Sequence, residues 1–213
     1  GNLILSGSNS SAGTTSLASG IVTFGNGANS GLASGLLTLG TGTFRSSDNT
    51  DRTFSNALSL SGTLTLGAAS PNAGSMIFKG NGTLTSAITL DVAGNSSATS
   101  AILEGALGGA FGITKSNTAT SLFLLGDSTY SGTTGFAAAA SGEIVFDSIE
   151  NVNSAAASAL GKVTTVANGT LATAYSGASV NSTLRYIGDG DTTDRVIRTG
   201  STTAVSAAGT VAI

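Results

Sequence analysis

Apolar side chains occur in short runs along the chain, and within each run they alternate with Thr, Ser or another small residue. A period of two is typical of a β-strand that buries one of its faces. Turns rich in Gly, Asn, Asp and Ser separate the runs, which recur at intervals of roughly ten to twenty residues. The pattern therefore predicts an all-β fold, as a sandwich, a barrel or a solenoid. The predicted strands are residues 3–5, 21–24, 36–39, 63–66, 76–78, 88–92, 122–125, 143–146, 163–166 and 183–187.

Self-similarity along the chain distinguishes between these folds, because stacked coils repeat a sequence frame and Greek-key strands do not. The stretch LILSGSNSSAGTTSLASGIVTF, residues 3–24, aligns with FLLGDSTYSGTTGFAAAASGEIVF, residues 123–146. Further along, TFRSSDNTDR (residues 43–52) aligns with TLRYIGDGDTTDR (residues 183–195). Both alignments indicate two diverged copies of one unit, which favours a solenoid.

We therefore predict a single β-solenoid segment over residues 1–213, with repeat copy A at about residues 1–67, connecting coils at 68–121 and copy B at 122–213. In such a fold each coil places an apolar row in a narrow interior, and its backbone pairs with the coils above and below at about 4.8 Å. Small residues permit tight corners, and β-branched Thr suits the outward face.

One stretch departs from the β pattern. The sequence SAAASALGK, residues 154–162, begins with Ser154, a suitable helix N-cap, and contains Gly161, a suitable residue just beyond a helix end. It predicts a short helical excursion from the solenoid.

Composition narrows the functional classes. Charged residues are only 9% of the chain, and there is no Cys and no His. Without Cys there is no disulfide scaffold or thiolate metal site, and without His neither a Ser-His-Asp nor a Cys-His centre can be built. The net charge of −3 provides no basic surface for nucleic acid. No segment reaches the ~20 apolar residues that a membrane-spanning helix needs.

Charge is concentrated in the two Thr-Asp-Arg modules. Asp189, Asp191 and Asp194 are weak candidates for a calcium site, because carboxylates near a Gly supply hard oxygen ligands. The first module has fewer carboxylates, however, and neither has the Glu that completes an EF-hand loop. The favoured interpretation is a repeated structural turn, in which Asp accepts hydrogen bonds from nearby backbone N–H groups and Arg pairs with Asp or stacks on the next coil. The residues assigned to this turn are Arg45, Asp51, Arg52, Arg185, Asp194 and Arg195.

A group of three carboxylates, Glu143, Asp147 and Glu150, is the best candidate for catalysis. Glycoside hydrolysis needs two carboxylates about 5 to 10 Å apart, and a lyase needs a base with a cation nearby. These residues flank a strand with a polar face and are expected to be solvated. We therefore predict no enzymatic activity, no catalytic residues and no cofactor.

Residues 112–134, GITKSNTATSLFLLGDSTYSGTT, resemble the autotransporter-associated β-strand repeat of bacterial surface and secreted proteins. In that repeat a glycine-led Leu-Thr-Lys segment precedes a Leu-x-Leu-x-Gly strand and then Asn-Thr-Tyr-x-Gly-x-Thr-Thr. Here residues 113–115, 122–126 and 129–134 hold those places, while Ser128 stands where Asn is usual and Gly135 replaces a frequent Val. The resemblance implies a right-handed parallel β-helix, exported and displayed at the bacterial cell surface. It brings no catalytic residues.

The leading hypothesis is a non-enzymatic extracellular structural or adhesive β-helix, such as a stalk, a passenger or a filament subunit. The alternative is a carbohydrate-active β-helix enzyme, a polysaccharide lyase or hydrolase. The expected partners are end-to-end copies of the chain or further repeats of a longer polypeptide, together with surface glycans or host ligands. Apolar strand motifs near both ends favour such stacking, and Ile213→Lys is expected to weaken it.

Overall fold

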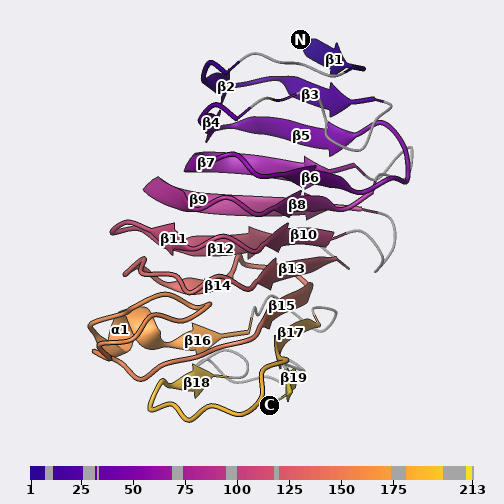
Figure 1. Cartoon of the computed structure of the whole chain (residues 1–213). Coiled ribbons are helices and arrows are strands. Elements are labelled where there is room, and N and C mark those ends of the chain that lie inside the picture. The colour runs from indigo at the N-terminus through magenta and orange to yellow at the C-terminus, as the bar shows by residue number, and fades with distance from the viewer. Residues whose placement is uncertain are drawn as a thin grey trace.

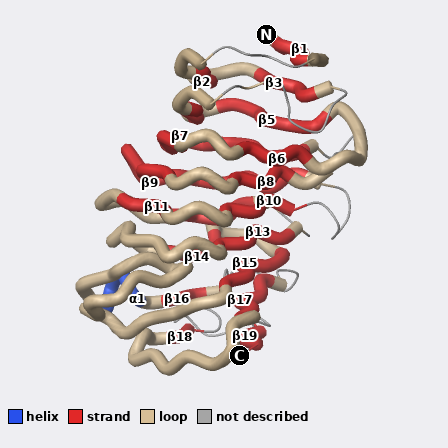
Figure 2. Tube along the Cα trace, viewed as in Figure 1, coloured by secondary structure: helices blue, strands red, loops and turns tan. Residues whose placement is uncertain are grey.

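The fold is seen in a computed structural model, which describes residues 1–7, 12–25, 32, 34–68, 74–94, 100–117, 120–173, 181–198 and 210–212. The chain winds through a stack of parallel strands from β1 at one end to β19 at the other (Figure 1). Strands form almost all of the regular structure, and one short helix, α1 (Val166–Gly169), lies beside the stack (Figure 2). The predicted parallel β-helix is confirmed.

Two large sheets build the coils. The main path of the ten-stranded sheet is β1 (Asn2–Leu5), β3 (Ile21–Phe24), β5 (Gly42–Ser46), β7 (Leu58–Gly67), β9 (Gly82–Ala93), β12 (Ile113–Ser116) and β14 (Thr134–Phe136), and β2 (Thr15–Leu17), β4 (Leu37–Leu39) and β11 (Leu107–Gly108) pair beside it. The seven-stranded sheet contains β6 (Arg52–Phe54), β8 (Met76–Phe78), β10 (Ser100–Leu103), β13 (Ser121–Leu124), β15 (Gly142–Phe146), β17 (Ser182–Tyr186) and β19 (Thr210–Ala212). A third sheet pairs β16 (Leu171–Ala172) with β18 (Ile197–Arg198).

The longest strands, β7 and β9, each turn a corner of the coil. The first part of β7 pairs with β4 and the second part with β5, and the register shifts between Leu60 and Gly62. Gly62 has a φ of +67°, which a residue with a side chain rarely adopts. The ten-stranded sheet thus covers two sides of the coil, and the seven-stranded sheet covers the third.

Inward residues of all three sides form one continuous core. Its N-terminal part contains four buried phenylalanines, Phe24, Phe44, Phe54 and Phe78, contributed by four strands. The ring centroids of Phe24 and Phe44 are 4.5 Å apart, and those of Phe54 and Phe78 are 5.3 Å apart. Aromatic pairs at these distances add to the stabilisation that burial of their area already provides. The alternation read in the sequence therefore predicts which residues face inward.

A column of close backbone contacts runs along one corner. A Cβ on Gly80 would lie 1.9 Å from Asn56 O, one on Gly105 would lie 2.0 Å from Gly80 O, and one on Gly126 would lie 2.4 Å from Gly105 O. No side chain fits at such distances. Glycine at this corner therefore lets successive coils approach at the spacing that the ladders on either side require.

The helix predicted at residues 154–162 is wrong. These residues form bends and turns, in which Ser128 N donates to Ser158 O at 2.9 Å and Lys162 N donates to Tyr130 O at 2.9 Å. The backbone is thus bonded to a neighbouring coil, and Leu160 is buried in the core. The helix begins later, after the N-cap Thr165, whose side chain accepts a hydrogen bond from Asn168 N.

The strand predicted at residues 163–166 is also wrong. Val163 lies outside any strand, with its side chain buried and its carbonyl accepting a hydrogen bond from Asn153 N at 2.7 Å. Val166 is exposed and begins α1. Val163 is buried in a loop, and the sequence pattern does not distinguish this from burial in a strand.

In each of the two aligned segments, the first strand pairs with the last in the same register, but the two segments lie on different sheets. Leu5 pairs with Phe24 in the ten-stranded sheet, and Leu124 pairs with Phe146 in the seven-stranded sheet. The two-copy organisation of the chain stays a prediction of the sequence.

Candidate functional site

The first Thr-Asp-Arg module connects β5 to β6. The Arg52 side chain is buried, its Nη2 lies 2.7 Å from Asp48 Oδ1, and its Nε donates to Ser46 Oγ at 3.0 Å. The Asp48 carboxylate also accepts a hydrogen bond from Thr50 N at 2.9 Å. That bond is the main cause of a lowered pKa of Asp48, and the Arg52 guanidinium adds to the effect.

The other two residues of this module contact neighbouring coils. Asp51 Oδ1 accepts a hydrogen bond from Ser75 N at 2.7 Å, and Arg45 Nε donates to Thr23 Oγ1 at 3.1 Å. One contact is to the coil that follows and the other to the coil that precedes. Asp51 and Arg45 therefore brace the stack on both sides of the turn.

The second module uses the same residue types on different partners. Arg195 is buried and donates three hydrogen bonds to backbone carbonyls, from Nε to Glu150 O at 2.8 Å, from Nη1 to Leu160 O at 2.9 Å and from Nη2 to Gly161 O at 2.8 Å. Burial lowers the pKa of Arg195. Asp194 Oδ1 accepts a hydrogen bond from Val152 N at 2.7 Å. Both residues fasten the segment that follows β15 to the coil that contains β17 and β18.

The calcium candidates point to separate backbone groups. Asp191 Oδ2 accepts a hydrogen bond from Ile149 N at 3.0 Å, and Asp194 bonds Val152 N. Asp189 is exposed. In the part of the chain that the structure describes, no three acidic side chains form a group that could hold a metal ion.

The three carboxylates considered for catalysis have different partners. Glu143 Oε2 lies 3.1 Å from Arg185 Nη2, Asp147 Oδ1 accepts from Ser148 Oγ at 3.4 Å, and Glu150 Oε2 accepts from Ser154 Oγ at 2.9 Å. Burial is the largest cause of a raised pKa of Asp147, and the nearby Asp127 and Asp191 carboxylates add to it. Of these three carboxylates, Glu143 lines a groove.

This groove crosses the outer face of the seven-stranded sheet and has a volume of about 650 Å³. Ser121, Glu143 and Thr183 are adjacent partners in three neighbouring strands. They form a polar floor that follows the axis of the solenoid. Phe123 and Arg185 form one wall, with the guanidinium carbon 5.9 Å from the centroid of the phenyl ring. The remaining lining residues are Ser100, Thr120, Ser141, Gly142 and Asn181.

A second hollow lies at the C-terminal end of the core and has a volume of about 240 Å³. Its walls include Phe146, Leu184, Tyr186 and Ile197, and Asp191 lies at its rim. The Tyr186 ring is 5.8 Å from that of Phe146, and the Tyr186 hydroxyl accepts a hydrogen bond from Gly190 N at 2.9 Å. Burial raises the pKa of Tyr186. The hollow continues the apolar core between coils.

Sequence reasoning missed one charged residue and one wall of the groove. Lys115 is buried, and its Nζ donates to Ser141 O at 2.8 Å and lies 5.9 Å from the Phe136 ring centroid. Burial lowers the pKa of Lys115 to about 8, against the opposing influence of Asp91. Phe123 was detectable, because in the pattern Ser-Leu-Phe-Leu the two Leu residues face inward and Phe faces outward.

Comparison of the chain with family models, with curated proteins and with solved structures gave no match. Within the described ranges, no helix has the length and apolar character needed to cross a membrane. Membership of the autotransporter-associated repeat family stays a prediction from residues 112–134.

Proposed function

We propose that this chain is a structural and adhesive segment of an extracellular bacterial β-helix protein, a stalk, passenger or filament subunit without enzymatic activity. The observation that supports this role most strongly is the uninterrupted parallel ladder from β6 to β19. Its backbone hydrogen bonds hold the coils in a rod and need few charged side chains. Each coil adds about 4.8 Å along the axis, so the fold spans distance efficiently. The resemblance of residues 112–134 to surface-protein repeats supports the location.

The uncovered strand β1 supports end-to-end assembly. Leu3 is 55% exposed and Ile4 is 60% exposed, and the strand pairs with β3. An edge strand with apolar side chains can accept a further parallel strand. The proposed occupant of this edge is a further coil, either the last coil of a second copy, which makes an open head-to-tail filament, or a coil of a longer polypeptide. Ile213, where the sequence also suggested a test, lies outside the described residues.

Sedimentation velocity over a range of protein concentrations tests this assembly. The chain is expected to self-associate, and Leu3→Lys is expected to weaken the association, because Leu3 lies in register with the buried Val22 and a charge there stands at the end of the apolar core. The matched control is Val166→Lys, since Val166 is 59% exposed but belongs to α1 at the side of the stack. A chain that stays monomeric, or an equal effect of both variants, would contradict stacking through β1.

The absence of turnover is tested separately. Neutral and acidic polysaccharides are incubated with the chain, and the products are assayed for new reducing ends and for unsaturated sugars. The groove holds a carboxylate and a guanidinium, Glu143 and Arg185, which is the observation that favours the alternative of a lyase or hydrolase. Robust turnover that Glu143→Gln abolishes would establish that alternative.

A further inference from the structure

We infer that the groove over β13, β15 and β17 binds a neutral linear oligosaccharide along the axis of the solenoid. This inference deepens the adhesive part of the proposed function and rests on it. Its first support is the chemistry of the floor, where Ser121, Glu143 and Thr183 present hydroxyl and carboxylate groups in three adjacent strands. The two hydroxyls can donate to and accept from sugar hydroxyls, and the carboxylate accepts from them.

The ion pair in the groove has the geometry of a polar clamp. Arg185 Nη2 lies 3.1 Å from Glu143 Oε2, and both side chains remain partly open to solvent, at 41% and 34% exposure. Ser121 Oγ donates to the same carboxylate oxygen at 3.4 Å. A guanidinium and a carboxylate that hold one another in place lose little further freedom when they bond vicinal hydroxyls.

One polar atom of this clamp lacks a partner. Arg185 Nε is buried and makes no hydrogen bond, although a buried N–H donor is nearly always satisfied. The unmet donor marks a guanidinium whose present position is not its best bonded one. A ligand hydroxyl or ring oxygen at the wall of the groove would supply the missing acceptor after a small rotation of the side chain.

The Phe123 wall supplies the apolar part of the site. Its ring is partly exposed beside Arg185, and it stands next to the polar floor. A pyranose ring has the matching character, with C–H groups on its faces and hydroxyls around its edge. The floor repeats at the spacing of about 4.8 Å between strands, and a linear glycan also repeats a similar polar edge along its length.

Other ligand classes match the groove less well. The backbones of β13 and β15 are paired on both sides, so an added peptide strand finds no free N–H or C=O groups. The charge of Arg185 is balanced by Glu143, which removes the attraction for a polyanion. The floor is too polar for an acyl chain. A neutral glycan needs no free backbone groups, no net positive charge and no apolar floor.

The test uses isothermal titration calorimetry of the full chain with cellohexaose, xylohexaose and maltohexaose, and with a galacturonate hexamer as the acidic probe. At least one neutral hexaose is expected to bind more tightly than the acidic probe. Phe123→Ala, Glu143→Gln and Arg185→Gln are each expected to raise the dissociation constant roughly tenfold. Thermal unfolding of each variant shows whether its fold is retained.

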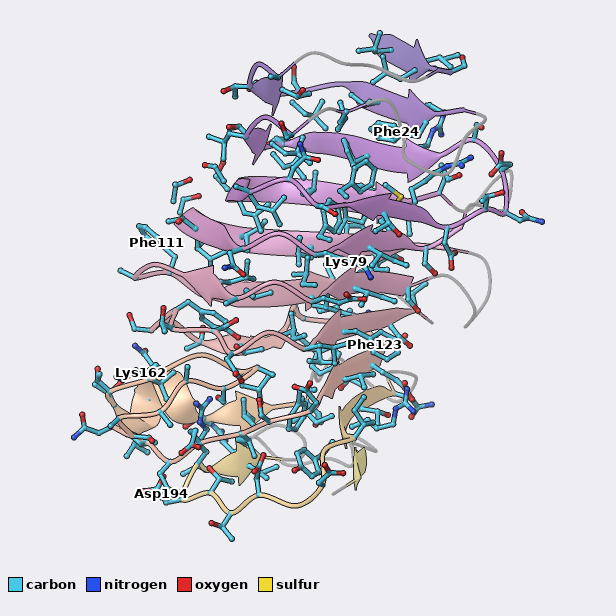
Figure 3. All side chains as sticks on the ribbon, in the orientation of Figure 1. Phe24, Lys79, Phe111, Phe123, Lys162 and Asp194 are labelled. Carbon is cyan, nitrogen blue, oxygen red and sulfur yellow. The ribbon has the colours of Figure 1, made fainter. Side chains whose placement is uncertain are left out.

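Two matched controls lie outside the groove. Phe111 is 42% exposed, and Figure 3 places it on the opposite side of the solenoid from Phe123. Lys79 and Glu104 form a similar exposed ion pair, with Nζ and Oε2 3.5 Å apart, nearer the N-terminal end of the stack. Phe111→Ala and Glu104→Gln are expected to leave the affinity unchanged.

Several outcomes would overturn the inference. These are no binding of any neutral hexaose, tighter binding of the acidic probe, or equal losses in the control variants. Should a groove variant fail to fold, chemical shifts of the labelled wild-type chain locate the ligand, and shifts that spare β13, β15 and β17 count against the groove. Self-association through β1 is measured without any glycan, so failure of binding and failure of the proposed assembly are distinguishable.

Discussion

Arg52 Nη2 and Asp48 Oδ1 are 2.7 Å apart, with the arginine side chain 1% exposed and the aspartate side chain 43% exposed. The two partners of this ion pair thus differ in how water can compensate for the loss of the other. A guanidinium left without its anion stays buried, whereas a carboxylate left without its cation is solvated.

We therefore expect the two halves of the pair to have unequal effects on stability. Asp48→Ala should lower the free energy of unfolding by roughly 3 kcal/mol, and Arg52→Met by about 1 to 2 kcal/mol, because methionine keeps the buried stem. Urea unfolding followed by circular dichroism measures both. Arg198→Met is the control, since Arg198 is exposed. A larger loss for Arg52→Met than for Asp48→Ala would contradict this account.

The glycine column predicts a position-dependent effect of a single methyl group. Gly105→Ala places a Cβ 2.0 Å from Gly80 O, so the coils must separate at this corner, and we expect a loss of more than roughly 2 kcal/mol. Gly7→Ala, where no atom lies within 4 Å of the new Cβ, should change stability little. Thermal unfolding midpoints compare the two variants. Equal midpoints would show that the corner adapts without strain.

The phenylalanine cluster predicts a large cavity effect. Phe44 is fully buried and lies 4.9 Å from the Phe54 ring centroid and 4.5 Å from that of Phe24. Phe44→Ala should cost about 3 to 5 kcal/mol, and Phe44→Leu clearly less, since leucine refills most of the volume. Phe111→Ala provides the exposed control. Denaturant midpoints that do not separate the alanine from the leucine variant would argue against tight packing here.

Lys115 predicts an unusual dependence of stability on pH. Its pKa is about 8 in the folded chain and about 10.4 in an unfolded one, so between these values the unfolded state binds more protons. Stability should therefore rise by roughly 2 kcal/mol from pH 8 to pH 10. Burial raises the pKa of Tyr130 to about 12, so this residue stays protonated in the folded chain while the unfolded chain begins to lose the proton near pH 10, which slightly opposes the rise at the upper end of the range.

Denaturant midpoints at each pH measure this rise. Lys115→Met should abolish the slope, because no ammonium is then buried, while Lys79→Met, at an exposed position, should retain it. The Asp91 carboxylate favours the charged form of Lys115, so Asp91→Asn is expected to lower the pKa of Lys115 further and to start the rise in stability at a lower pH. A flat profile for the unaltered chain would contradict the buried, partly titrated ammonium.

Much of the fold follows from sequence pattern, since alternation fixes which residues face inward. The strands Ile21–Phe24 and Met76–Phe78 have the bounds that the pattern predicts. The lengths of β7 and β9 were not predictable from the pattern. It predicts a strand only at residues 63–66, whereas Gly62 bends one longer strand, Leu58–Gly67, around a corner. The Ala-rich stretch at 154–162 failed as a helix because its backbone bonds to Ser128 and Tyr130, which lie far away in sequence.

The site residues divide in the same way. Local turn chemistry predicts that an Asp carboxylate accepts from a nearby backbone N–H, and Asp48 does so from Thr50 N. Asp51 and Asp194 instead accept from Ser75 N and Val152 N on other coils, which the local sequence does not specify. The partners of Arg195 are carbonyls of Leu160 and Gly161, which no local pattern specifies. The meeting of Glu143 with Arg185 depends on the register between β15 and β17, across a long intervening segment.

The segment between β15 and β17 shows that the solenoid accommodates connections of different length. Gly142 is paired with Ser182, 40 residues later, whereas Ser121 is paired with Glu143, 22 residues later, and the ladder is parallel and unshifted in both cases. The position of a residue along the axis therefore depends on how many paired strands precede it and not on the number of residues between them. The segment between β15 and β17 extends outward at a fixed level of the stack and is held by anchors such as Arg195, which lies after β17. A connecting segment at one level of the stack can therefore differ in length and sequence while the groove and the core at other levels keep their positions.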